Sequence, residues 1–355
     1  MSGTSLDGVD AALVEIREEG CRLIQAVFHA FDDDLRHELL VLNQAGHDEI
    51  LRLSLAANTL ASRYASAVQS LLNKANLSAT AISAIGCHGQ TIRHRPDLGF
   101  TLQIGNAALL AELTGITVVA DFRNRDIAAG GQGAPLVPAF HAAAFRNAQH
   151  NRVIVNIGGI SNLTWLPATG VVTGFDCGPG NLLLDGWTQQ HLGSPFDRDG
   201  TWAASGKLIP ELLRNLLDFH FFTAAPPKST GRDMFHLEWL QDFLSGNYAP
   251  ADIQATLLEL SARAISDAIQ QHCKEADEVY LCGGGAHNMA LKKRLAQMLA
   301  PLPLKLTNEL GIGADWVEAT AFAWLAYRAR LGLPGNLPEV TGARGSRILG
   351  AIYSA

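Results

Sequence analysis

Hydrophobic positions recur at helical spacing in two long segments of the chain. Residues 48–76 carry apolar or aromatic side chains three to five residues apart, namely Leu51, Leu55, Leu60, Tyr64, Val68 and Leu71. Residues 251–269 carry a second such stripe, formed by Ile253, Leu257, Leu260, Ala264 and Ala268. This spacing is typical of amphipathic helices that bury one face. We therefore expect two long scaffold helices.

Short apolar runs elsewhere in the chain predict strands at residues 11–16, 22–28, 82–87, 117–120, 152–156, 163–166, 171–176 and 278–282. Shorter helices are expected at residues 106–113, 139–147, 181–190, 208–217 and 316–331. Strands that alternate with helices predict an α/β fold. A strand, a turn of small residues and a strand occur both at the start of the chain and near residue 157, which suggests a duplicated core.

The glycine- and proline-rich segment 128–138, AAGGQGAPLVP, is the best candidate for a boundary between two lobes. We expect a first lobe at residues 1–127, with about 310–355 packing back on it, and a second lobe at 128–309. A length of 355 residues fits two domains.

Composition and charge narrow the class of protein. The net charge of −7 disfavours a nucleic-acid binder, and 48% hydrophobic with 17% charged residues is ordinary for a soluble enzyme. The five cysteines show no Cys-x-x-Cys spacing, so neither a zinc cluster nor a disulfide framework is indicated. No apolar run is long enough for a membrane helix, and no signal peptide is visible. We expect a cytoplasmic protein.

The segment 171–181, VVTGFDCGPGN, is the first candidate for chemistry. An apolar strand runs into Asp176 and then into a glycine-rich turn, and Asn181 is placed to cap the following helix. A carboxylate at a sheet edge suits a general base, because it can accept a proton from an oxygen nucleophile. The alternative is a structural Asp in a turn.

Three glycine-rich turns adjoin predicted strands, at residues 3–8, 158–159 and 283–285. Bare backbone at such turns can contact a nucleotide's phosphates or sugar, whereas ordinary tight turns are the alternative. Val9 and Asp10 replace the residues that a Walker loop requires, and neither a Rossmann fingerprint, a Gly-x-Ser-x-Gly elbow nor a His-Glu-x-x-His pair occurs. Together the turns suit a phosphoryl donor.

Two basic groups are candidates for anion binding. Arg123 and Arg125 follow a predicted strand and could form a fork for a carboxylate or phosphate, or else pair with Asp121 and Asp126. Lys228 and Arg232 lie in a predicted loop, for which an exposed basic surface is the better interpretation.

Several long motifs now make a family resemblance specific. The chain resembles the anhydro-N-acetylmuramic acid kinase family from end to end through MSGTSLDGVD, CHGQTIRH, QIGN, ADFRNRDIAAGGQGAPLVPAFH, VNIGGISN, GFDCGPGN, KSTGR, CGGGAHN and LPGNLPEVTGA. The resemblance implies two lobes of a related actin-like, ribonuclease H-like ATPase core around a nucleotide cleft. It also implies magnesium-ATP as cofactor, a small amino-sugar substrate and a homodimer.

The resemblance assigns roles by position. Asp176 matches the catalytic base, and Gln90, Arg123, Arg125 and Glu318 are implied to bind the sugar, with Arg125 favoured for its lactyl carboxylate. Nucleotide binding is implied for Gly3, Thr4, Ser5, Leu6, Asp7, Gly8, Val9, Asp10, Gly158, Gly159, Gly283, Gly284 and Gly285. No protein ligand for a resident metal is assigned.

The implied reaction is phosphorylation of the 6-oxygen of 1,6-anhydro-N-acetylmuramic acid while water opens the anhydro bridge, as in the recycling of cell-wall sugars. A plain amino-sugar or hexose kinase and a non-catalytic ATP-binding regulator are the alternatives. Family members usually begin several residues earlier, with an apolar strand. A chain that starts at Met1 is therefore expected to lack that strand and to hold its first loop by a frayed terminus.

Overall fold

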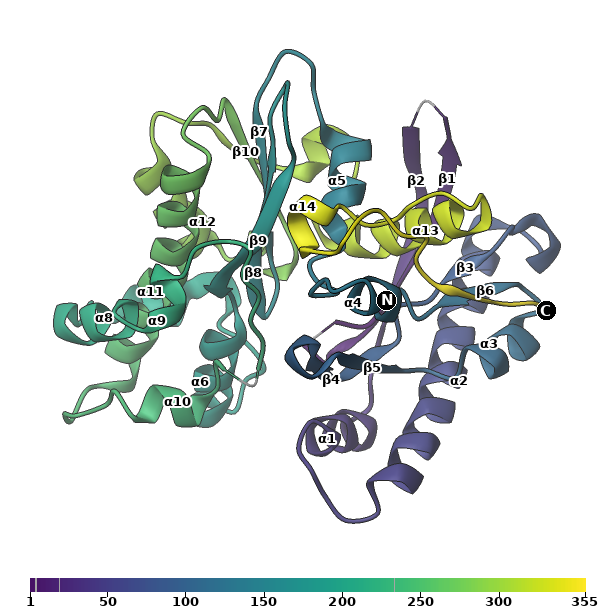
Figure 1. Cartoon of the computed structure of the whole chain (residues 1–355). Helices are drawn as coiled ribbons and strands as arrows, with labels where there is room; N and C mark the ends of the chain where they lie inside the picture. The colour runs from purple at the N-terminus through teal and green to yellow at the C-terminus, as the bar shows by residue number, and fades with distance from the viewer. Residues whose placement is uncertain (4, 19, 233) are drawn as a thin grey trace. The chain divides into compact units, whose positions relative to one another are not determined.

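A computed structural model describes residues 1–3, 5–18, 20–232 and 234–355 of the chain (Figure 1). The chain folds into two compact units. Unit 1 comprises Met1–Ala144 and Trp316–Ala355, and unit 2 comprises Phe145–Asp315. The segment 128–138, in which the boundary was expected, belongs to unit 1. Among the described residues, no helix is long and apolar enough to cross a membrane.

Unit 1 contains a long hairpin, a short hairpin and a three-stranded sheet. Its strands are β1 (Gly8–Arg17), β2 (Gly20–Ala30), β3 (Ile85–Gly86), β4 (Gln90–Arg95), β5 (Phe100–Ile104), β6 (Val118–Ala120) and β12 (Ala351–Tyr353). Its helices are α1 (Asp33–Leu42), α2 (Glu49–Ala75), α3 (Ala107–Thr114), α4 (Asn124–Ala128), α13 (Val317–Arg330) and α14 (Pro338–Thr341), and α5 (Val137–Phe145) ends at the first residue of unit 2.

Unit 2 is built on a five-stranded mixed sheet in the order β11-β10-β7-β8-β9 (Figure 1). Its strands are β7 (Arg152–Ile157), β8 (Ile160–Leu166), β9 (Thr173–Pro179), β10 (Glu278–Cys282) and β11 (Leu304–Leu306). Its helices are α6 (Leu182–Leu192), α7 (Thr201–Ser205), α8 (Pro210–Leu217), α9 (His220–Thr223), α10 (Leu237–Gln241), α11 (Pro250–His272) and α12 (Met289–Leu299).

The two scaffold helices form where the hydrophobic periodicity predicts them, as α2 and α11. Helix α2 buries Leu60, Tyr64 and Leu71 against the hairpin β1–β2 and α3, whereas Leu51 and Leu55 in its first turns stay exposed. Helix α11 packs on β8 and β9. The strand expected at 82–87 is reduced to two residues, and the hairpin β4–β5 was not predicted.

The two units share part of a strand pattern. In unit 2, β7 lies between the parallel pair β10–β11 and the antiparallel pair β8–β9. Unit 1 has the corresponding parallel pair β3–β6 and antiparallel pair β1–β2, but no described strand joins them. The duplicated core predicted from the two turns is therefore visible in the topology.

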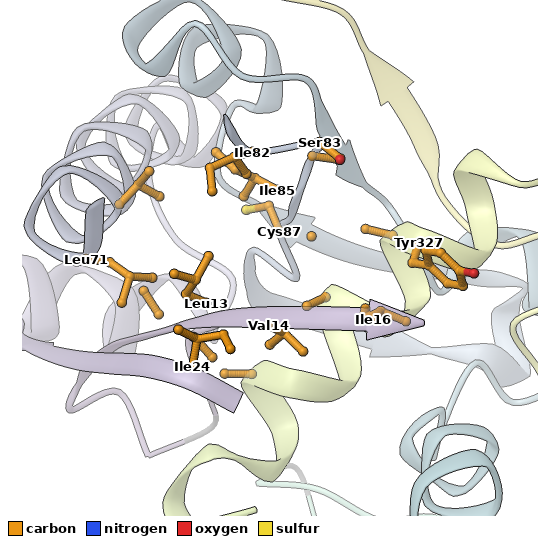
Figure 2. Close-up of a pocket in the computed structure, with 18 of the residues that line it drawn as sticks. Leu13, Val14, Ile16, Ile24, Leu71, Ile82, Ser83, Ile85, Cys87 and Tyr327 are labelled. Atoms are coloured by element: carbon orange, nitrogen blue, oxygen red, sulfur yellow. The ribbon is translucent and has the colours of Figure 1, made fainter. Parts of the chain in front are cut away.

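An apolar cavity of about 760 Å³ separates β1 from β3 in unit 1. Figure 2 shows that its walls include Leu13 and Ile16 of β1, Leu71 of α2, Ile85 of β3 and Tyr327 of α13. The facing edges of β1 and β3 have no strand partner among the described residues.

The backbone of Met1 already pairs with β1 at the end of this cavity. The N–H of Asp10 donates to the carbonyl of Met1 at 2.9 Å, and the amino group of Met1 donates to the carbonyl of Asp10 at 2.8 Å. This exchange is the pattern of an antiparallel pair. Residues added before Met1 would therefore lie opposite residues 11–16 of β1, inside the cavity.

We predict that a six-residue extension of valine, isoleucine and leucine before Met1 raises the melting temperature by at least about 5 °C. Each buried aliphatic side chain contributes about 1.5–3 kcal/mol before the cost of ordering the segment. Differential scanning calorimetry measures the change, with a six-residue Gly/Ser extension as the matched control. Equal melting temperatures for the two extended proteins would contradict the assignment of this cavity as a strand position.

Candidate active site

Asp176 lies within β9, an edge strand of the unit 2 sheet, and this strand continues past residue 176, where it was expected to end. Asn162 of β8 pairs with Asp176, but Ser161 pairs with Gly178, so Cys177 is an extra residue in a β-bulge. Bulges often occur beside active sites, because they bend a strand and redirect its side chains. The irregular strand thus sets the direction of this carboxylate.

The carboxylate of Asp176 is buried, with an exposed fraction of 7% for the residue, and a neighbouring loop holds it. Its Oδ2 accepts a hydrogen bond from the backbone N–H of Thr230 at 2.8 Å, and its backbone N–H donates to the carbonyl of Lys228 at 3.1 Å. The KSTGR segment therefore runs along the edge of β9. A carboxylate oriented in this way suits a general base. The backbone contact from Thr230 could not be inferred from the sequence.

Lys228 is half-buried, contrary to the expectation of an exposed basic loop. Its Nζ donates to the carbonyl of Phe221 at 3.0 Å and lies 4.6 Å from the centre of the Phe221 ring. Burial lowers the pKa of Lys228, and the nearby Cys177 and Asp176 side chains oppose that shift. These contacts make Lys228 an anchor for the loop that holds Asp176. Arg232, the other basic residue of this loop, is also half-buried.

The turn Gly158–Gly159 between β7 and β8 is only two residues long, because both strands extend into the gap left between the strands expected at 152–156 and 163–166. Its two carbonyl groups accept hydrogen bonds of 2.8–3.0 Å from the backbone N–H groups of residues 180–182. These groups lie at the start of α6, so the turn and the helix satisfy one another. A Cβ at Gly180 would come within 2.4 Å of the Gly158 carbonyl, which explains the glycine at that position.

The sequence had suggested that the side chain of Asn181 caps α6, but it does not. Its Nδ2 donates instead to the carbonyl of Ile157 at 3.4 Å, across the turn. The glycine carbonyls accept the N–H groups of residues 180–182, of which Leu182 is the first residue of α6. Asn181 therefore ties α6 to the end of β7.

The turn Gly283–Gly285 packs against the same end of β7. A Cβ at Gly283 would lie 2.3 Å from Oδ1 of Asn156, and a Cβ at Gly285 would lie 2.3 Å from Cγ2 of Ile157. A Cβ at Gly284 would meet nothing within 4 Å. The outer glycines, Gly283 and Gly285, thus form a tight turn, and the central Gly284 leaves its backbone open. Two of the three glycine-rich turns therefore meet in unit 2.

The third glycine-rich turn belongs to unit 1, and Thr4 lies outside the described residues. Gly3, Ser5, Leu6 and Asp7 precede β1, whereas Gly8, Val9 and Asp10 already form its first three residues. The side chains of Leu6 and Val9 are buried, so these two residues can offer a ligand only their backbone. Oγ of Ser5 donates to Oδ1 of Asp7 at 2.6 Å, and both residues are exposed.

Hydrogen bonds hold the start of this loop. Oγ of Ser2 lies 2.7 Å from Oη of Tyr64 and donates to the carbonyl of Gly89 at 3.2 Å. Nε2 of Gln90, one of the candidate sugar-binding residues, donates to the carbonyl of Gly3 at 3.1 Å. The segment 88–90 thus fixes the backbone at the start of the chain.

Arg123 and Arg125 lie in different surroundings in the contacts that the structure shows. Nη1 of Arg123 donates to the carbonyl of Gly133 at 2.8 Å, and its Nε and Nη2 contact Nε2 of His88 at 3.1 and 2.9 Å. Arg125 is exposed and lines a shallow pocket with Asn124 and other residues. The His88 contact was missed, although this histidine stands in the CHGQTIRH motif.

The two aspartates beside these arginines do not form an ion-pair set with them in the contacts that the structure shows. Asp126 is fully buried, and its carboxylate accepts hydrogen bonds from the backbone N–H of Gly133 and from the side chains of Asn336 and Thr341 at 2.7–2.8 Å. Asp121 is exposed and accepts from Nδ2 of Asn124 at 2.7 Å. Asp126 therefore anchors the C-terminal segment of the chain to the loop beside Arg123.

Glu318 at the start of α13 lies within electrostatic reach of Arg123. Burial raises the pKa of this carboxyl, and the positive charges of Arg123 and of the Met1 amino group lower it in part. Gln90, Arg123 and Glu318 therefore gather around the first loop in unit 1. Within the described ranges, no group of three or more His, Cys, Asp and Glu side chains has the arrangement of a metal site.

A buried, oriented carboxylate and glycine turns with open backbone are the elements of a phosphotransferase, and comparisons with known proteins specify the class. The model of the family "Anhydro-N-acetylmuramic acid kinase" matches residues 1–355. The anhydro-N-acetylmuramic acid kinase of Nitrosomonas europaea is 55% identical over 100% of this chain and 98% of its own length. That of Thiobacillus denitrificans is 54% identical over 100% of this chain and 96% of its own length.

The chain is therefore a sugar kinase, and it belongs to the anhydro-N-acetylmuramic acid kinase family. Among solved structures, a glucokinase of the ROK family from Streptomyces griseus, in complex with glucose and AMPPNP, is 11% identical with a TM-score of 0.40. That alignment covers 90% of this chain and 96% of the glucokinase chain. This similarity is too weak to bear on the fold, which rests on the family and on the topology of the two units.

We predict that Gly285→Ala destabilises unit 2, whereas Gly284→Ala does not. The new Cβ at position 285 would overlap Cγ2 of Ile157, and overpacking of this kind costs about 1–3 kcal/mol. The melting temperature should fall by about 2–4 °C for each kcal/mol, as measured by differential scanning calorimetry. The Gly284→Ala protein is the matched control, and equal melting of the two variants would contradict the packing described for this turn.

Proposed function

We propose that this kinase transfers the γ-phosphoryl group of ATP to the 6-oxygen of 1,6-anhydro-N-acetylmuramic acid while water opens the anhydro ring. The product is N-acetylmuramic acid 6-phosphate. Family membership over the whole chain supports the substrate, and the observation that carries the mechanism is the buried carboxylate of Asp176, oriented by the backbone N–H of Thr230. The reaction fits the recycling of cell-wall sugars.

Asp176 is the proposed general base. It accepts a proton from water as the water oxygen bonds to the anomeric carbon and the bond from that carbon to the 6-oxygen breaks. The 6-oxygen leaves with the electron pair of that bond and forms the new bond to phosphorus, while ADP departs. One carboxylate thus serves both bond changes, and positioning and charge stabilisation supply the rest of the catalysis.

The glycine turns fit a nucleotide because they offer backbone where a side chain would obstruct a ligand. Gly284 faces open space, and Gly158 and Gly159 adjoin it through the end of β7. We assign the nucleoside side of ATP to residues 283–285 and its phosphates to the turn at 158–159 and the loop at residues 3–10. Magnesium, the usual companion of ATP, is generally held by one or two carboxylates and the phosphates, so it needs no dedicated protein cage.

Arg123 is the proposed receptor for the lactyl carboxylate of the sugar, with Arg125 as the second candidate. From the sequence, Arg125 was favoured over Arg123 for this role. The preference is reversed because Arg123 is held by His88 and Gly133, whereas Arg125 is an exposed side chain. A fixed guanidinium loses less freedom when it binds a carboxylate. Gln90 and Glu318 are proposed to contact the same sugar.

The source of the anomeric oxygen tests the proposed reaction. In water enriched in oxygen-18, we predict one labelled oxygen in the sugar phosphate, at the anomeric hydroxyl, because ring opening consumes water. The reaction is stopped early and analysed by mass spectrometry, with N-acetylmuramic acid 6-phosphate kept in the same labelled buffer as the control for exchange. An unlabelled product that keeps the anhydro ring would indicate a plain sugar kinase instead.

The role of Asp176 is tested by Asp176→Asn. We predict a loss of turnover of about 10²–10⁴-fold, because the amide cannot accept the proton, with ATP affinity little changed. Steady-state rates and calorimetric ATP binding measure the two effects, and Asp218→Asn, at an exposed position of the same unit, is the control. Retained turnover in Asp176→Asn would show that Asp176 is not the general base. If the wild type itself binds ATP but shows no turnover, the protein is a non-catalytic ATP-binding regulator.

A further inference from the structure

His88 is buried in unit 1, and both of its ring nitrogens have partners. Its Nδ1 lies 2.7 Å from the carbonyl oxygen of Gly89 and 3.3 Å from that of Ser2. Carbonyl oxygens only accept hydrogen bonds, so Nδ1 carries the proton and donates it. The ring also packs on Phe322 with 4.6 Å between ring centroids, so its orientation is fixed from two sides.

The second ring nitrogen of His88 is consequently an acceptor. Nε2 has its lone pair directed at Arg123, whose Nε and Nη2 are donors at 3.1 and 2.9 Å. Burial, and then the charge of Arg123, hold the pKa of His88 well below its usual value. The imidazole therefore stays neutral, and it can accept hydrogen bonds from a cation that it would otherwise repel.

A third contact completes the fixation of this guanidinium. Nη1 of Arg123 donates to the carbonyl of Gly133 at 2.8 Å, and Gly133 is itself bound through its N–H to the buried carboxylate of Asp126. The contacts with His88 and Gly133 engage all three nitrogens of the side chain. Arg123 thus has a defined plane and direction before any ligand binds, which is the property that bidentate recognition of a carboxylate requires.

We propose that His88 is a positioning residue that orients Arg123 for the carboxylate of the acidic sugar, and so helps to set the specificity of the kinase for a carboxylate-bearing substrate. This inference rests on the proposed function. His88 does not itself contact substrate in this account. It acts by accepting hydrogen bonds from the arginine, and a side chain without an acceptor at position 88 leaves the guanidinium free to rotate.

The test measures kcat and KM of the wild type, His88→Leu and His88→Gln on each of two sugar substrates. The first substrate is 1,6-anhydro-N-acetylmuramic acid, and the second is 1,6-anhydro-N-acetylglucosamine, which lacks the lactyl carboxylate. For His88→Leu we expect KM for the acidic sugar to rise at least tenfold, with kcat, KM for ATP and kcat/KM for the neutral sugar little changed. His88→Gln keeps an acceptor oxygen and should recover part of the loss.

Two further variants sharpen the comparison. His37→Leu removes an exposed imidazole on α1 of the same unit, away from the contacts of Arg123, and it should leave the ratio of the two sugars unchanged. Arg123→Ala should raise KM for the acidic sugar as His88→Leu does, and the double variant should be no worse than Arg123→Ala alone. Equal losses for both sugars, a loss in kcat, or additive effects in the double variant would overturn the proposal.

A spectroscopic readout separates this proposal from the proposed function. In nitrogen-15 spectra, the Nε–H of Arg123 should give a sharp, slowly exchanging signal in the wild type and a broadened one in His88→Leu, whatever reaction the protein catalyses. If neither sugar is phosphorylated, the proposed function fails, while this signal still decides whether His88 orients the arginine. A signal unaffected by His88→Leu would show that it does not.

Discussion

The candidate nucleotide region of unit 2 depends on backbone approaches that leave no room for a side chain. Gly180 lies against the Gly158 carbonyl, and Gly283 and Gly285 lie against the last two residues of β7, each so close that a Cβ would overlap its neighbour. These contacts bring α6 and the turn after β10 to one end of the sheet. Gly283 and Gly285 pack against β7, whereas Gly284 faces open space. The three consecutive glycines therefore have two roles: the outer two allow close packing, and the central one leaves its backbone accessible.

In unit 1, a series of hydrogen bonds holds the charged side chain of Arg123 in place. The buried Asp126 holds Gly133, Gly133 holds Arg123, and Arg123 is held in turn by His88. A buried carboxylate costs free energy unless it is fully hydrogen-bonded, and Asp126 meets that condition with three neutral donors. Asp126, Gly133 and Arg123 of the motif ADFRNRDIAAGGQGAPLVPAFH therefore have a role in the packing of unit 1 itself.

The sequence predicted the helices α2 and α11 and the strand β10 because hydrophobic periodicity is a local property. It also offered a signal that was not used, since β4 and β5 flank a Pro-Asp-Leu-Gly turn. Other features depend on distant residues. The Thr230 contact to Asp176, the burial of Lys228 and the hydrogen bonds from residues 180–182 to the glycine carbonyls all arise from segments that meet only in the folded unit. The separation of Arg123 from Arg125 has the same origin, because His88 and Gly133 select one arginine of the pair.

Unit 1 is assembled from two stretches of chain that are separated by the whole of unit 2, and α13 from the later stretch packs on β1 and β3. During synthesis, the first 144 residues therefore emerge from the ribosome well before α13, the helix that completes their core. At synthesis rates of about 5–20 residues per second, that interval is on the order of ten seconds or more. Unit 2, which is continuous, can fold during this wait, while the apolar edges of the nascent unit 1 remain uncovered and open to chaperones or to premature association.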